Sequence, residues 1–215
     1  MKAVITLPLL FLLSPIINAA YAENATYLPD KQMSYVHILV YKEGFLKALG
    51  HNHVIHTGQI NGKLEVNKKG HGQFSASIPV ASFVVDNPAD RILSGNNFEN
   101  EIDAESAQAT KNNMLGDRML HAKTFPIIHI QGMINTITNK TALAKVEIKI
   151  RNTTRNISIP VSIVTGKQQL IMSGRFSINQ TDFNIKPFSL MGGALAVQNK
   201  VSIRFEIVLN KHMIK

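Results

Sequence analysis

The chain has 215 residues, no cysteine and a formal net charge of +9 at pH 7. The lack of cysteine excludes disulfides, thiolate catalysis and zinc–cysteine sites, so burial of apolar side chains must stabilise the fold. The basic charge suits an anionic ligand or an anionic membrane surface. No basic stretch interleaved with aromatic residues is present, and we therefore expect no nucleic-acid partner.

The N-terminal segment resembles a secretory signal peptide. Lys2 precedes the apolar run AVITLPLLFLLSPII, and the small-x-small triplet AYA ends at Ala22. A retained membrane anchor is the alternative, but Pro8 and Pro15 interrupt the run, which is shorter than the ~20 residues of a span. We predict a signal peptide over residues 1–22, one domain over 23–215, and a periplasmic or secreted protein.

Alternation of apolar and polar residues with period 2 predicts half-buried strands along most of the chain. Turn signals such as Asn61-Gly62 and Lys69-Gly70 separate these segments. Regularly spaced short strands predict an all-β sandwich or barrel of eight or nine strands. The predicted strands with this alternation span residues 60–66, 74–80, 146–150, 157–163, 172–178 and 201–209. Two further predicted strands, residues 35–41 and 127–134, are apolar on both faces, which favours cover on both sides.

One region lacks this alternation. Between Pro88 and His121 the stretch EIDAESAQATKNNML favours a helix, with Asn100 or Asp103 as its N-cap. The sequence therefore predicts one helical insertion near residues 98–117 within an otherwise β domain.

Three glycines share the parity of the apolar residues in their strands: Gly62, Gly132 and Gly174. A closed sheet of about eight strands is filled by side chains or holds one small ligand. Inward glycines either leave space for such a ligand or mark bulges and bends of the strands. Both interpretations stay open at this point.

From residue 114 onward the chain contains three spaced motifs. They are Leu120-His121-Ala122 with Phe125-Pro126, Gly174-x-Phe176-x-Ile178-x-x-Thr181-Asp182-Phe183-x-Ile185, and Val201-x-Ile203-x-Phe205. In this combination the chain resembles the YceI-like family of exported, lipocalin-like barrels. Upstream, LGHNHVI is similar to a Gly-His-x-His variant found in one branch of that family.

The resemblance implies an antiparallel lipocalin-like β-barrel that encloses an apolar ligand such as a polyprenyl chain or an isoprenoid quinone. Each buried methylene contributes about 0.8 kcal/mol, so a long prenyl chain needs few polar contacts. Because they share parity with apolar residues in their strands, we expect Phe176, Ile178, Ile203 and Phe205 to line the cavity. The expected partner is thus an amphiphilic lipid.

The pair His51 and His53 allows three interpretations. Spaced i, i+2, the two imidazoles share one face of a strand and could bind a metal with a third ligand, for which His121 is the first candidate beside His37 and His129. They could instead contact a lipid head group at the mouth of the cavity, or be structural. Metal binding is the less favoured alternative, because an unbroken strand over residues 52–66 would turn both outward unless a bulge near Gly58 reverses the parity.

Enzymatic motifs are missing from the sequence. It has no Gly-x-Ser-x-Gly elbow and no phosphate-binding glycine loop before a helix. We therefore expect a binding protein that is not an enzyme and that needs no catalytic cofactor.

Overall fold

The computed structural model describes residues 24–138 and 140–212, so the predicted signal peptide lies outside the described residues. The helices are α1 (Pro88–Ser94) and α2 (Ala104–Leu115). The strands are β1 (Ala25–Pro29), β2 (Tyr35–Val40), β3 (Lys42–Glu43), β4 (His53–Thr57), β5 (Asn61–Val66), β6 (Gly72–Pro79), β7 (Val84–Val85), β8 (Ile127–Ile134), β9 (Thr141–Ile150), β10 (Thr153–Thr165), β11 (Gln169–Asn179), β12 (Ser189–Leu190), β13 (Leu195–Val197) and β14 (Lys200–Lys211).

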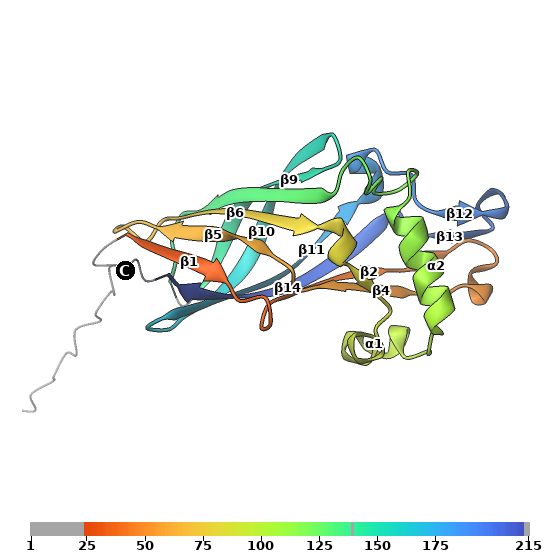
Figure 1. Cartoon of the computed structure of the whole chain (residues 1–215), viewed down its shortest axis with the longest axis horizontal. Coiled ribbons are helices and arrows are strands. Elements are labelled where there is room, and N and C mark those ends of the chain that lie inside the picture. Colours follow the sequence, from red (N-terminus) through yellow and green to blue (C-terminus); the bar gives the residue numbers. More distant parts are fainter. Residues whose placement is uncertain (1–23, 139, 213–215) are drawn as a thin grey trace, which may run out of the picture.

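Eight strands form a closed antiparallel barrel in the order β1-β5-β6-β8-β9-β10-β11-β14, because β1 pairs with both β5 and β14 (Figure 1). This confirms the predicted lipocalin-like barrel. Strand β14 is long enough to have two neighbours on one side. Its last residues pair with β1, whereas Ser202–Glu206 pair with β2, from which the sheet continues through β4 to β7.

Long hairpins explain why the barrel closes in this order. Ten residues of β9 pair with β10 around a tight turn at Arg151, which has a positive φ of 54°. Eleven residues of β11 pair with β14. Alternate side chains of these strands point inward and form one apolar core, and among its fully buried members are Leu64, Ile134 and Leu170.

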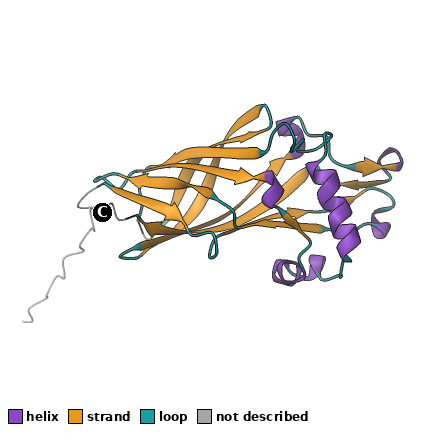
Figure 2. Cartoon of the chain, viewed as in Figure 1, coloured by secondary structure: helices purple, strands orange, loops and turns teal. Residues whose placement is uncertain are grey.

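Both helices lie at one end of the barrel, together with a small second sheet of β12, β13 and β3 (Figures 1 and 2). Helix α2 confirms the predicted helix, and its N-cap is Asp103, whose carboxylate accepts the Ser106 N–H at 2.8 Å. Helix α1 was not predicted as a separate helix. It begins after Asn87, whose side chain accepts the Ala89 N–H at 3.0 Å. No helix in the described part of the chain is long and apolar enough to cross a membrane.

Phenylalanine rings occupy the space that two inward glycines leave. Gly132 faces Phe74 across β8 and β6, and Gly174 faces Phe205 across β11 and β14. A Cβ at Gly174 would lie 2.8 Å from Cζ of Phe205. These two glycines therefore let aromatic rings from the neighbouring strand pack close to the backbone, which differs from both of the roles considered from sequence.

We predict that Gly132→Ala lowers the free energy of unfolding by about 1–3 kcal/mol, the usual cost of overpacking. The added Cβ would lie 2.6 Å from Cζ of Phe74 and closer still to the backbone carbonyl of Lys145, which cannot move without breaking the strand pair. Urea unfolding measures this, with Gly166→Ala as control because its Cβ meets only the Gln169 carbonyl at 3.3 Å. Equal stability of the two variants would contradict the close packing of Phe74.

Candidate functional site

The barrel encloses a cavity of about 380 Å³. Its wall is made almost entirely of aliphatic and aromatic side chains from all eight barrel strands, from β2 and β4, and from α2. On β14 alone the lining residues alternate from Val201 to Leu209, which corresponds to a wall about 27 Å long at ~3.4 Å per residue. The cavity is therefore narrow and long, a shape suited to an extended chain.

The four residues that the sequence predicts for this wall all lie on it. Phe176 and Ile178 come from β11, and Ile203 and Phe205 come from the neighbouring β14. The Phe176 and Phe205 rings meet edge-on with centroids 6.3 Å apart. Their contact with a ligand stays a prediction, but their position is that of cavity-lining residues.

His53 is the histidine of the cavity wall, and a buried ion pair holds it. Its Nδ1 lies 2.6 Å from Oδ2 of Asp86. The other carboxylate oxygen, Oδ1, accepts the Val54 N–H at 2.9 Å and an Arg91 guanidinium N–H at 2.6 Å. The Asp86 side chain is 0 % exposed and that of Arg91 only 4 %, so the two opposite charges neutralise each other where water does not reach them.

The charge state of Asp86 follows from these contacts. Burial acts to raise the pKa of Asp86, but the hydrogen bond from His53, the Val54 N–H and the Arg91 guanidinium outweigh it and hold the pKa below its ordinary value of 3.8. Asp86 also has a positive φ of 55°, a conformation that costs energy for a residue with a side chain. The ionised carboxylate thus accepts the Nδ1–H of His53.

The structure separates the three histidines of the metal hypothesis. His51 is exposed and precedes β4, whereas His53 is on the cavity wall. His121 lies in the loop after α2, where its Nε2 contacts the Thr124 hydroxyl at 3.0 Å. The parity reverses between β4 and β5, which are separate strands, so His53 and Leu64 both face inward. In the described chain, no three-residue group that could hold a metal contains His51, His53 or His121.

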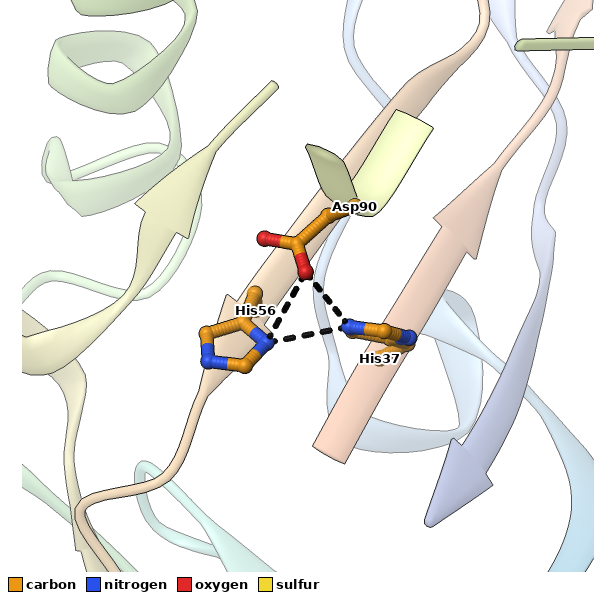
Figure 3. A group of neighbouring side chains, drawn as sticks. All are labelled: His37, His56 and Asp90. Carbon is orange, nitrogen blue, oxygen red and sulfur yellow. Dashed lines mark hydrogen bonds and ion pairs between the residues drawn. The ribbon is translucent and has the colours of Figure 1, made fainter. Parts of the chain in front are cut away.

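A different cluster brings together three groups that could ligate a metal: His37 of β2, His56 of β4 and Asp90 of α1 (Figure 3). Nε2 of His37 lies 3.0 Å from both His56 Nδ1 and Asp90 Oδ1, and the last two atoms are 3.5 Å apart. The cluster lies on the outer face of the sheet, where α1 covers it. His37 faces His56 on one side and Arg204 on the other in the strand register.

Arg204 determines how this cluster can be used. Its guanidinium lies 2.9 Å from Nδ1 of His37, and because a guanidinium can only donate, Nδ1 must accept. The ring proton is then on Nε2, where it is donated toward Asp90. A metal-binding histidine normally donates its second ring N–H to an acceptor, and here the second nitrogen faces a cation. The geometry therefore favours a hydrogen-bonded network that fastens α1 to the sheet over a metal site.

This network predicts a pH dependence of stability. Burial, to which the neighbouring Tyr35 ring contributes, is the main cause that lowers the pKa of His37 below its ordinary 6.5. Arg204 and His56 lower this pKa further, and Asp90 raises it by less than burial and these two groups together lower it. The unfolded chain then binds a proton more readily than the folded one, so the free energy of unfolding falls as the pH drops below about 6.5, by at most about 1.4 kcal/mol per pH unit.

The measurement is urea unfolding of the wild type and of His37→Gln between pH 7.5 and 5. Glutamine can still accept from Arg204 and donate to Asp90, but it does not titrate. We expect a shallower loss of stability with falling pH for the variant. Identical slopes for the two proteins would show that His37 does not contribute to the pH dependence.

Sequence reasoning missed Asp86, Arg91 and Asp90, and it considered His37 only as a third metal ligand. Asp86 follows the apolar pair Val84-Val85 and directly precedes the Asn87-Pro88 helix start. An acid directly after an apolar pair and before a helix start was the local signal, and it does not show which histidine lies opposite.

A closed antiparallel barrel around an apolar cavity defines the lipocalin-like class of folds. Residues 30–209 match the sequence profile of the YceI-like domain, and the chain belongs to this family. Proteins of the family are β-barrels known for binding hydrophobic ligands, and they are generally binding proteins rather than enzymes. No protein of curated function matches the chain.

Solved structures show the same fold. BcnA from Burkholderia cenocepacia is similar with a TM-score of 0.61 and 16 % identity, over 84 % of this chain and 98 % of that one. A YceI protein from Campylobacter jejuni gives a TM-score of 0.51 and 16 % identity, over 72 % of this chain and 82 % of that one. At these identities the likeness concerns the fold.

Proposed function

We propose that this protein is an exported, non-enzymatic carrier that holds an extended isoprenoid-type chain, such as a polyprenyl lipid or an isoprenoid quinone, inside its barrel. The observation that supports this most strongly is the long, narrow, apolar cavity of about 380 Å³. Burial of each methylene contributes about 0.8 kcal/mol, so a chain of several prenyl units binds tightly by burial alone. A branched, flexible chain can follow such a wall, whereas a compact polar metabolite would leave its hydrogen-bonding groups unpaired.

Export and the membrane partner belong to the same proposal. The signal-like residues 1–22 support a periplasmic or secreted location. Without Lys2 the 22 Lys and Arg and 14 Asp and Glu give a net charge of 22 − 14 = +8, which supports contact with an anionic membrane surface from which an apolar lipid could be taken. The ligand supplies no catalytic chemistry in this proposal.

The test is native mass spectrometry of the protein purified from its own source, with organic extraction and elemental analysis of the same sample. We expect a bound lipid with a prenyl-type chain in about one copy per barrel. A protein that carries stoichiometric metal and no lipid would overturn the proposal and return the function to metal binding.

A further inference from the structure

We propose that His53 selects, among apolar chains, those that end in a hydroxyl group, because Asp86 and Arg91 hold its ring so that Nε2 accepts a hydrogen bond in the cavity. This inference rests on the proposed function, since it names the head group that the same cavity recognises.

The position of His53 is that of a head-group contact. His53 pairs with Val40, the last residue of β2, and β2 leads directly into β3 of the small sheet. Thr110 and Asn113 of α2 line the same cavity. Because α2 and the small sheet both lie at this end of the barrel (Figure 1), His53 is found where an amphiphile would place its polar end.

The orientation of the ring is determined by the groups behind it. The Asp86 carboxylate accepts from Nδ1, so neutral His53 carries its proton on that nitrogen and presents a lone pair on Nε2. No hydrogen bond from Nε2 to a described residue is present. Arg91 lies 2.6 Å from the other carboxylate oxygen and holds Asp86 in the orientation that places Oδ2 against Nδ1.

Because Nε2 of His53 accepts a hydrogen bond, it can distinguish ligands that have the same apolar chain and different polar end groups. An alcohol or a hydroquinone donates an O–H to Nε2, whereas an ether, an ester or the quinone carbonyl can only accept and would place a lone pair against a lone pair. A site that hydrogen-bonds an O–H discriminates strongly against an analogue that lacks it, because its own polar group is then left unpaired.

The experiment compares three probes with the same fifteen-carbon chain: farnesol, farnesyl methyl ether and farnesyl monophosphate. We expect the full chain without its leader to bind farnesol about tenfold more tightly than the ether, as measured by displacement of a fluorescent fatty acid. His53→Leu should reduce the difference to less than about twofold through weaker farnesol binding. The control is His129→Leu, an exposed histidine on the outer face of β8 between the cavity-lining residues Ile128 and Ile130, which should keep the preference.

Each outcome is decisive. The inference would be overturned if the wild type bound the alcohol and the ether equally. It would also be overturned if the wild type bound the monophosphate most tightly and His53→Leu lost this binding, because His53 would then act as a donor. Binding of none of the three probes would instead contradict the proposed function. Preferential farnesol binding that survives in His53→Leu would assign the selection to another group.

A second, independent observation concerns the outer end of the small sheet. Phe45, Leu49 and Met191 are 93 %, 72 % and 75 % exposed. They belong to two segments that lie side by side, since β3 pairs with β13 and the Leu46 N–H donates to the Ala194 carbonyl at 2.7 Å. Large side chains with this exposure in one place mark an interaction surface.

The charges of the two segments indicate the partner. Residues 42–50 and 186–200 contain Lys42, Lys47, Lys186 and Lys200 and a single acid, Glu43. Exposed apolar side chains on segments that also carry lysines suit the interface of an anionic bilayer, where the apolar side chains insert and the lysines contact head groups. We infer that this tip, defined as residues 42–50 and 186–200, docks on an anionic membrane, at the end of the barrel where Phe188 and Val197 line the cavity.

Co-sedimentation with vesicles of phosphatidylcholine containing a third of phosphatidylglycerol tests the docking. We expect the wild type to bind and Phe45→Ser/Met191→Ser to lose at least tenfold in affinity, with loss for both proteins in pure phosphatidylcholine. Met133→Ser is the control, because Met133 is 52 % exposed on the side of the barrel. Failure of the wild type to bind anionic vesicles, equal loss in the control, or a tip that instead mediates self-association in sedimentation velocity would overturn the inference.

Discussion

Replacement of Asp86 with asparagine is expected to lower the free energy of unfolding by about 3–5 kcal/mol, the cost of removing one partner of a buried ion pair. The Arg91 guanidinium would stay buried without its anion, and His53 would lose the acceptor of its Nδ1–H. Asparagine keeps the size of the side chain and tolerates the positive φ at this position, so backbone strain does not account for the effect.

Urea unfolding at pH 7 measures this loss, and Glu65→Gln is the matched control. The Glu65–Lys63 pair is about half exposed, so its removal should cost less than about 1 kcal/mol. The pKa of Asp86 is lowered in the folded protein; its contribution is therefore present at neutral pH and lost as the pH falls below about 4. A variant as stable as the control would show that Asp86 and Arg91 are not a compensated buried pair.

Replacement of Phe176 with arginine is expected to reduce binding of a prenyl chain at least a hundredfold. The substitution removes an aromatic part of the cavity wall and introduces a charge that an apolar ligand cannot solvate. The fold should lose about 3–5 kcal/mol as well, because Phe176 packs against the Phe205 ring. Binding of the farnesol probe and circular dichroism of the same samples separate the two effects.

Two further variants make the result specific to the cavity. Ile178→Trp fills part of the same space without a charge and should also weaken binding. Ser177→Arg places the same charge on the next residue of β11, which is exposed, and should leave binding unchanged. If Ile178→Trp bound the probe as the wild type does, the cavity would not be the binding site.

Local pattern was sufficient for most of the barrel. Six segments with period 2 correspond to β5, β6, β9, β10, β11 and β14. The two segments that are apolar on both faces, residues 35–41 and 127–134, correspond to β2 and β8. Strand β1, which closes the barrel, was missed, because its five residues include Pro29 and show too few alternations. Predicted strand 35–41 corresponds to β2, which is not one of the eight strands of the closed barrel. It pairs with only part of β14, because β14 is long enough to pair with both β1 and β2, and the sequence of β2 does not show this.

The candidate site could be predicted only in part, because local pattern shows which residues of one strand share a face and not how separate strands are placed. Parity within one strand was enough to place Phe176 and Phe205 on the cavity wall. It was not enough for His53, because the break between β4 and β5 changes which parity faces inward. It could not separate His53, which lines the cavity, from His51, which is exposed two residues earlier.

The all-β class with a helical insertion, the apolar interior and the lack of cysteine chemistry could be predicted from local sequence, because they depend on neighbours along the chain. The contacts of Asp86 with His53, 33 residues away, and of Arg204 with His37, 167 residues away, became visible only in the folded chain. Such pairs depend on strand register and on how α1 packs across β4, and an isolated stretch of sequence contains neither. The chemistry of the cavity therefore depends on contacts between distant segments, whereas its apolar character depends on the strands alone.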